Sequence, residues 1–230
     1  MKAMILAAGR GERMRPLTDV LPKPLLTVAG KPLIVYHLEK LSALGIQEVV
    51  INIAYLGDKI RHALGDGSQW GVSIVYSEEP EPLETAGALV HALPLLGEAP
   101  FLLINGDVWT DMDFSVLVNE PLNASVASLF FVDNPAHNTQ GDFSLSPDGR
   151  VESKSSHPQY TFSGLALIDP KMIDLYPHKK QKFPLRDVFN FYIQQQQLQG
   201  KYYSGEWCDV GTPERLAELE RAVINHETNA

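Results

Sequence analysis

Glycine and arginine cluster near the N-terminus in a stretch whose residue types suit phosphate binding. LAAGRGERMRPLT, residues 6–18, holds Gly9, Gly11 and three arginines directly after a short apolar run. Glycine permits positive φ and close approach of the main chain, so successive N–H groups can form an anion-binding concavity. The stretch is not a Rossmann fingerprint, because Met14 replaces the third glycine, nor a Walker A loop, because no Gly-Lys-Ser/Thr follows. The two glycines alone fit a simple tight turn as well as a phosphate-binding loop. The three arginines favour phosphate binding.

One lysine and two aspartates further along the chain could complete such a site. Lys23 stands in LPKPL, where each proline biases the preceding residue, Leu21 or Lys23, towards extended backbone. Asp107 follows the apolar run FLLING, and Asp209 stands in GEWCDVGTPERL. Mg²⁺ takes one or two carboxylates together with phosphate oxygens. Taken singly, Lys23 fits an ordinary surface lysine and Asn-Gly-Asp fits a simple turn, so the hypothesis depends on their combination.

Other residues that could do chemistry fit structural roles. Asp111 and Asp113 are predicted to be turn or helix-start residues. If residues 207–210 are extended, Trp207 and Asp209 share one face and Cys208 takes the other, which predicts a small buried apolar residue rather than a nucleophile. The seven histidines show no metal-ligand spacing, and those at 37 and 91 lie in helical patterns that predict structural roles.

Composition excludes several classes of protein. The chain has 230 residues and a net charge of −9, which argues against a nucleic-acid binder. No apolar run approaches the roughly 20 residues that cross a bilayer, and the N-terminal run passes directly into RGERMR, which indicates a buried strand rather than an export signal. The single cysteine excludes an internal disulfide and a thiolate metal cluster. A cytoplasmic protein without membrane or nucleic-acid partners is expected.

Strand-like and helical patterns alternate over the first half of the chain. This rhythm predicts a parallel sheet covered by helices on both faces, with ligands beyond the carboxyl ends of the strands. AAGRG and NGD both fall at such ends. The expected strands are 2–8, 48–54, 72–76 and 100–106, and the expected helices are 32–45, 58–65 and 85–96.

The rhythm changes after about residue 120. Strands are expected at 124–132, 142–146 and 161–168, separated by segments with turn chemistry, and helices at 183–197 and 212–224. Thr212 before Pro213 suits a helix N-cap followed by the first helical position. The FNFYI segment, residues 189–193, fits either the core or a subunit contact, and the core is the expectation.

Five motifs in one order give the chain a family resemblance. L-A-A-G-x-G-x-R-M-x-P-L-T, P-K-P-L, A-G-K-P-L-I, N-G-D and W-x-D-V-G-T-P resemble those of the sugar-1-phosphate nucleotidyltransferases over nearly the whole chain. The resemblance implies an α/β, Rossmann-like fold with a mostly parallel mixed sheet flanked by helices. It also implies a single domain over 1–230, with a nucleotide-binding half, 1–120, and a sugar-binding half, 121–230.

Within this family, further stretches point to one branch. LGDGSQWGVSIVYSEEPEPLETAGAL, QGDF and TFSGLAL are most similar to bacterial enzymes of peptidoglycan recycling that transfer a uridylyl group from UTP to N-acetylmuramate-1-phosphate, releasing pyrophosphate. The resemblance implies Mg²⁺ as cofactor. A monomer or small homo-oligomer is expected, and the motifs do not distinguish between the two. The alternative within the same chemistry is glucose-1-phosphate or mannose-1-phosphate with UTP, dTTP or GTP.

The resemblance also implies site residues. Arg13 and Lys23 would be the catalytic cations on the phosphates, and Asp107 and Asp209 would hold the metal. The nucleotide would contact Ala8, Gly9, Gly11, Glu12, Arg13, Lys23, Thr85 and Gly87, and the sugar would contact Asn105, Asp142 and Glu152. Many relatives carry Glu-Lys-Pro in the sugar half, where this chain has VESKSSHP, so Glu152 and Lys154 are candidates for those roles.

The implied reaction needs no Ser-His-Asp or Cys-His arrangement. Its nucleophile is a phosphate monoester, already largely dianionic at neutral pH because its second pKa is about 6. Catalysis then consists of in-line positioning and charge neutralisation. Two other classes stay open: a nucleotide-sensing module without turnover, and a nicotinamide-dependent oxidoreductase, which the incomplete glycine fingerprint disfavours.

Overall fold

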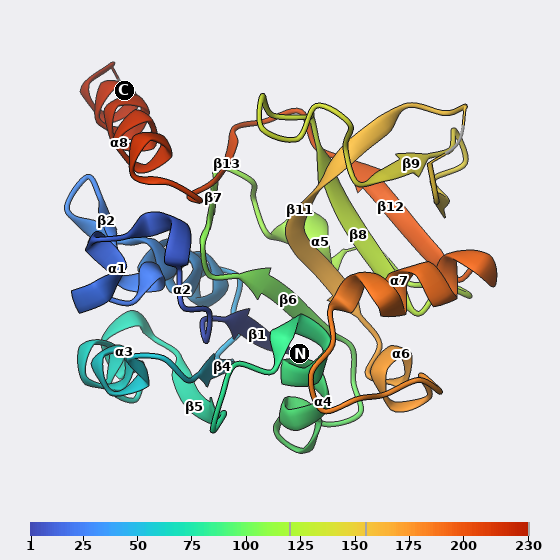
Figure 1. Ribbon diagram of the computed structural model, residues 1–230, viewed down its shortest axis with the longest axis horizontal. Coiled ribbons are helices and arrows are strands. Elements are labelled where there is room, and N and C mark those ends of the chain that lie inside the picture. The colour runs from blue at the N-terminus through green and yellow to red at the C-terminus, as the bar shows by residue number, and fades with distance from the viewer. Residues whose placement is uncertain (120, 155, 230) are drawn as a thin grey trace.

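One mixed sheet forms the centre of the molecule in the computed structural model, which describes residues 1–119, 121–154 and 156–229 (Figure 1). Nine strands of the described residues belong to this sheet. They are β1 (Lys2–Leu6), β4 (Glu48–Ile53), β5 (Ser73–Glu78), β6 (Phe101–Asn105), β8 (Ala127–Val132), β9 (Phe143–Leu145), β10 (Val151–Glu152), β11 (Gln159–Ile168) and β12 (Leu198–Tyr202).

The strand order confirms the predicted Rossmann-like mixed sheet. β6, β1, β4 and β5 are neighbours in that order and run parallel. β11 joins antiparallel to β6 and also pairs with β8, which pairs in parallel with β12. Strands from both predicted halves therefore share one sheet, and the assignment of the halves to nucleotide and sugar stays a prediction.

Helices cover both faces, as predicted. The longer ones are α2 (Leu33–Ala43), α3 (Gly57–Leu64), α4 (Glu84–Leu96), α7 (Leu185–Gln194) and α8 (Pro213–Asn229). The short ones are α1 (Leu17–Val20), α5 (Ser115–Val118) and α6 (Lys171–Asp174), with 3-10 turns η1 (Glu12–Met14), η2 (Lys23–Leu25) and η3 (Ser68–Trp70). No helix in the described part of the chain is long and apolar enough to span a bilayer.

The core explains the unbroken apolar run of the first strand. Ala3 and Ile5 pack into the cluster that holds α2, α3 and α5, while Met4 packs into the opposite cluster with α4, α6 and α7. Successive side chains of a strand point to opposite faces, so a strand buried on both faces must be apolar throughout. The FNFYI segment belongs to the core as expected, because Phe189 and Ile193 are buried there.

A third, smaller cluster attaches α8 to the edge of the molecule. α8 packs Leu219 and Val223 against two short antiparallel pairs, β2 (Thr27–Val28) with β3 (Lys31–Pro32), and β7 (Val108–Thr110) with β13 (Trp207–Asp209). Figure 1 shows α8, in red, beside β2, in blue. Cys208 faces this cluster, and burial raises the pKa of its thiol to about 11, so the predicted apolar role fits.

The sequence patterns gave a wrong backbone prediction at Lys23 and did not predict several short strands. Leu21 is extended as predicted, but Lys23 begins η2, because the N–H groups of Leu25 and Leu26 donate to the carbonyls of Pro22 and Lys23. These two hydrogen bonds outweigh the bias that a following proline imposes. The pairs β2–β3 and β7–β13 and the strand β12 were not predicted, because strands of two to five residues carry little periodicity.

His37 is buried behind the strand that follows Asp107. The residue is 1 % exposed, and its ring stacks on Phe114. Burial lowers the pKa of His37 from 6.5 to about 4, although a hydrogen bond to the Val108 backbone opposes the shift. The structural role predicted for His37 is confirmed.

This burial predicts a pH dependence of stability. The unfolded chain binds the His37 proton more tightly, so the free energy of unfolding is highest above the ordinary pKa and falls as the pH drops through about 4, by about 3 kcal/mol. Between about pH 7 and pH 4.5, the wild type is expected to lose more free energy of unfolding than His37→Gln, by about 2 kcal/mol. Urea unfolding at each pH measures the difference. His91→Gln, at an exposed histidine of α4, is the control. Equal pH dependence in wild type and His37→Gln would contradict the prediction.

Candidate active site

A cavity of about 460 Å³ opens at the carboxyl ends of β1 and β6, where the sequence predicted ligand binding. Its wall contains backbone and side chains from the glycine turn, η2, the segment before α4 and the end of β6. Of the predicted site residues, Ala8, Gly9, Gly11, Glu12, Arg13, Lys23, Thr85, Asn105 and Asp107 line it.

The glycine turn owes its shape to Gly11 rather than Gly9. Gly11 has φ +65°, and a Cβ there would lie 2.9 Å from the Cγ2 of Thr18. The Thr18 hydroxyl donates to the Gly11 carbonyl at 2.7 Å, and Met14 N donates to the same oxygen, which anchors the turn. A Cβ on Gly9 would meet nothing within 4 Å, so at this position the main chain borders open space.

Lys23 is directed into the cavity rather than into solvent. Its ammonium lies 2.5 Å from Oδ2 of Asp107, and its side chain is 11 % exposed. Asp107 follows Gly106, whose N–H donates to the Leu6 carbonyl, and a Cβ on Gly106 would lie 2.7 Å from that oxygen. Only glycine allows the ends of β6 and β1 to approach this closely, and this contact places Asp107 beside the turn.

Asp209 arrives next to Asp107 through the pairing of β13 with β7. Asp209 stands opposite Val108, and Val210 N donates to the Asp107 carbonyl at 2.8 Å. Oδ1 of Asp209 lies 2.6 Å from Nη1 of Arg215 and 2.9 Å from Nε2 of His137. The backbones of the two acids therefore adjoin, although they lie far apart in sequence, and Asp209 itself is not part of the cavity wall.

The donor set suits a cation that keeps most of its ligands outside the protein. Asp107 uses Oδ2 for Lys23, and Asp209 uses Oδ1 for Arg215 and His137, so each has its second oxygen without a partner in the described chain. No cluster of three or more acidic, histidine or cysteine side chains suited to a metal occurs among the described residues. Two carboxylates match Mg²⁺, which completes its shell with phosphate oxygens and water, better than Ca²⁺.

A buried polar network that the sequence analysis did not single out supports another wall. The Asn52 amide accepts from Ala7 N at 2.8 Å and donates to Oε1 of Glu79 at 2.7 Å. Oε2 of Glu79 accepts from Leu83 N at 3.0 Å. Asn52 and Glu79 both line the cavity, one at the carboxyl end of β4 and one just past β5. The strand-end rule that singled out Asp107 could have found them.

Thr85 and Gly87 have different surroundings. Thr85 lines the cavity, and its hydroxyl accepts from Leu185 N at 2.7 Å. Gly87 is buried and is not part of the cavity wall, and a Cβ there would lie 2.5 Å from the carbonyl oxygen of Gln181. Close packing against that loop accounts for the glycine, and its predicted contact with the base stays a prediction.

The predicted sugar residues lie partly outside the cavity. Asn105 lines it and packs against Gly164, where φ is +80° and a Cβ would lie 2.7 Å from Nδ2 of Asn105. Asp142 is not part of the wall, and its Oδ2 accepts from Phe162 N at 3.0 Å. Glu152 is also outside the wall and pairs with His157 at 2.8 Å.

Asp113 and Thr212 confirm two local predictions. Oδ1 of Asp113 accepts from Ser115 N at 2.8 Å at the start of α5, and this hydrogen bond lowers the pKa of the Asp113 carboxyl. Asp111 instead accepts from the Tyr203 hydroxyl at 2.7 Å. Thr212 Oγ1 accepts from Arg215 N at the start of α8. None of these residues borders the cavity.

Comparison with known proteins agrees with this arrangement. A family model described as nucleotidyl transferase matches residues 2–226. N-acetylmuramate alpha-1-phosphate uridylyltransferase of Neisseria meningitidis serogroup B is 51% identical over 226 residues, covering 96% of this chain and 97% of that protein. Mannose-1-phosphate guanylyltransferase catalytic subunit beta of Drosophila melanogaster is 31% identical over 92% of this chain, which spans 60% of its length.

A solved structure matches the whole fold. A putative glucose-1-phosphate thymidylyltransferase from Bacillus anthracis superposes with a TM-score of 0.83 and 27% identity, covering 96% of this chain and 94% of its own. Enzymes of this family generally use a divalent metal. The comparisons favour an enzyme over a nucleotide-sensing module or a nicotinamide-dependent oxidoreductase. The chain belongs to the nucleotidyl transferase family, among the sugar-1-phosphate nucleotidyltransferases.

Proposed function

We propose that this chain transfers a uridylyl group from UTP to N-acetylmuramate-1-phosphate, giving UDP-N-acetylmuramate and pyrophosphate. The relative from Neisseria meningitidis, 51% identical over nearly the full length of both chains, is the observation that carries the substrate assignment. The reaction belongs to peptidoglycan recycling in the cytoplasm, with Mg²⁺ as cofactor.

The cavity wall supports phosphoryl chemistry with a leaving group of high charge. An oxygen of the sugar phosphate attacks the α-phosphorus of UTP, and the bond from that phosphorus to the oxygen bridging to the β-phosphate breaks, so pyrophosphate leaves. Arg13 and Lys23 bind the triphosphate and counter the charge that grows on pyrophosphate. Main-chain N–H groups of the glycine turn contribute further donors. Preorganised donors of this kind commonly lower the activation barrier more than any other single effect.

The metal and substrate contacts follow the same assignment. Asp107 and Asp209 would hold Mg²⁺ through their partner-free oxygens. Mg²⁺, when bound, supplies positive charge that offsets the repulsion between the two anionic reactants. Thr85 and Gly87 serve the base, and Asn105, Asp142 and Glu152 serve the sugar. Asp142 and Glu152 lie outside the cavity wall, so they act only if the sugar extends beyond it.

A panel of sugar-1-phosphates against nucleotide triphosphates tests the proposal. N-acetylmuramate-1-phosphate with UTP and Mg²⁺ is expected to exceed glucose-1-phosphate and mannose-1-phosphate in kcat/KM by about a hundredfold, because sites built for polar groups discriminate strongly. N-acetylglucosamine-1-phosphate, which lacks only the lactyl ether, is the matched control. Pyrophosphate release and the mass of the nucleotide sugar are the measurements. Preference for mannose-1-phosphate with GTP, or for glucose-1-phosphate with dTTP, would overturn the substrate assignment.

A further inference from the structure

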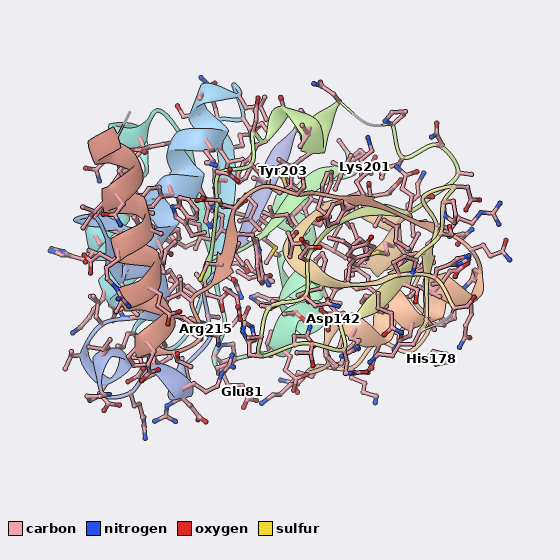
Figure 2. The ribbon with its side chains drawn as sticks, turned by 90° about the horizontal axis from the view of Figure 1, so that it is seen from above. Glu81, Asp142, His178, Lys201, Tyr203 and Arg215 are labelled. Carbon is pink, nitrogen blue, oxygen red and sulfur yellow. The ribbon has the colours of Figure 1, made fainter. Side chains whose placement is uncertain are left out.

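Arg215 is a cation at the site that neither the motifs nor the proposed mechanism uses. It belongs to the first turn of α8, and Figure 2 shows it at the start of that helix. Its side chain is only 15 % exposed, and Nη1 lies 2.6 Å from Oδ1 of Asp209. One end of the guanidinium is therefore bound to an acid, which offsets the cost of burying the charge.

The other end of the guanidinium lies against the cavity wall. Nη2 of Arg215 lies almost at the point where a Cβ on Gly211 would stand, and Gly211 lines the cavity. Nη2 of Arg13 is 3.3 Å from that same point. Two guanidinium groups from opposite ends of the chain thus meet over one glycine, and any side chain at 211 would displace Arg215.

The neighbourhood leaves this pair with an excess of positive charge. Asp209 is shared between Arg215 and His137, which comes from the loop between β8 and β9. Arg13 forms no ion pair within the described part of the chain. Two adjacent guanidinium groups repel each other unless an anion lies between them, and their planar donor forks match phosphate oxygens.

We propose that Arg215 is a second phosphate-binding arginine, which contacts through Nη2 the same phosphate of the triphosphate that Arg13 binds. Asp209 holds Nη1 and so orients the fork before the ligand arrives. The ligand class, a nucleoside triphosphate, rests on the proposed function. The geometry itself rests on the contacts of Arg215, Gly211 and Arg13.

Binding of inorganic pyrophosphate and of UTP without divalent metal tests the proposal. Arg215→Met is expected to weaken both affinities by about tenfold or more, the usual effect of losing a charge-assisted hydrogen bond. Arg215→Lys keeps the charge without the fork and is expected to lie between wild type and Arg215→Met. Arg221→Met removes an arginine from an exposed position of the same helix and is expected to bind like wild type. Isothermal titration calorimetry measures each affinity.

Two further measurements distinguish phosphate binding by Arg215 from a purely structural role, in which Arg215 only holds Asp209 in place. Mn²⁺ affinity of Arg215→Met is expected to stay equal or to increase, because a competing cation has been removed from Asp209. Weaker Mn²⁺ binding with unchanged pyrophosphate affinity would overturn the proposal, and so would an equal loss in Arg221→Met. If Arg215→Met does not fold, as judged by thermal unfolding, wild-type pyrophosphate affinity in Arg215→Lys overturns the proposal. Absence of uridylyl transfer with every sugar phosphate would instead sink the proposed function.

Discussion

Asp107→Asn is expected to lower kcat by at least about 10³-fold while the chain stays folded. Losing a carboxylate of the proposed metal site removes transition-state charge stabilisation of several kcal/mol, and each 1.36 kcal/mol is about tenfold in rate. The amide of asparagine still accepts a hydrogen bond from Lys23, whose ammonium lies 2.5 Å from the Asp107 carboxylate in the wild type. Initial rates of pyrophosphate release at saturating UTP and sugar phosphate give kcat.

Asp113→Asn is the matched control for this variant. Asp113 lies six residues further along, between β7 and α5, and accepts from Ser115 N outside the cavity, and asparagine can accept that bond too. Its kcat is expected to equal that of the wild type, and both variants are expected to give wild-type circular dichroism spectra. Near-normal turnover in Asp107→Asn would refute the metal role of Asp107.

Lys23→Met is expected to lower kcat/KM for UTP by about 10²–10³-fold, as for other preorganised donors to a developing negative charge. Methionine keeps much of the side-chain volume and removes only the ammonium, which the cavity wall holds at 11 % side-chain exposure. The loss is expected in kcat as well as in KM, because the charge on pyrophosphate is greatest when it leaves. Steady-state kinetics over a range of UTP concentrations separates the two constants.

Lys31→Met provides the comparison for Lys23→Met. Lys31 belongs to β3, and its ammonium contacts the exposed Glu39 rather than the cavity. Its removal is expected to leave kcat/KM unchanged, since exposed ion pairs contribute little. If Lys23→Met and Lys31→Met had the same kcat/KM for UTP, Lys23 would be an ordinary surface lysine despite its position.

Local sequence patterns were sufficient to predict a feature wherever a single strand, helix or turn determines it. The apolar run of β1 follows from burial on both faces, and the helical spacing of α2 and α7 follows from contact with one face of the sheet. Gly11 is required by its own positive φ, and Asp113 and Thr212 begin helices through hydrogen bonds two or three residues ahead. In each case the interacting groups are close in sequence, so residue type and spacing carry the information.

Local rules were wrong at Lys23 and incomplete where the partners of a residue lie on distant segments. A Cβ at Gly87 would lie 2.5 Å from the Gln181 carbonyl oxygen, and no local pattern shows this contact. Lys23 precedes a proline but begins a 3-10 turn, because two backbone hydrogen bonds outweigh the local bias. The strand-end rule could have pointed to Asn52 and Glu79, but their hydrogen bond to each other and the bond from Ala7 N to Asn52 join different elements and leave no local signal.

The amino-acid sequence by itself determined the family, the alternating α/β plan and the strand-end positions of the glycine turn and Asp107. Only the tertiary structure decided which side chains meet: Lys23 with Asp107, and Arg215 and His137 with Asp209. The physical reason is that strand order and the pairing of β7 with β13 set these distances. No periodicity along the chain encodes a contact between residues about a hundred positions apart.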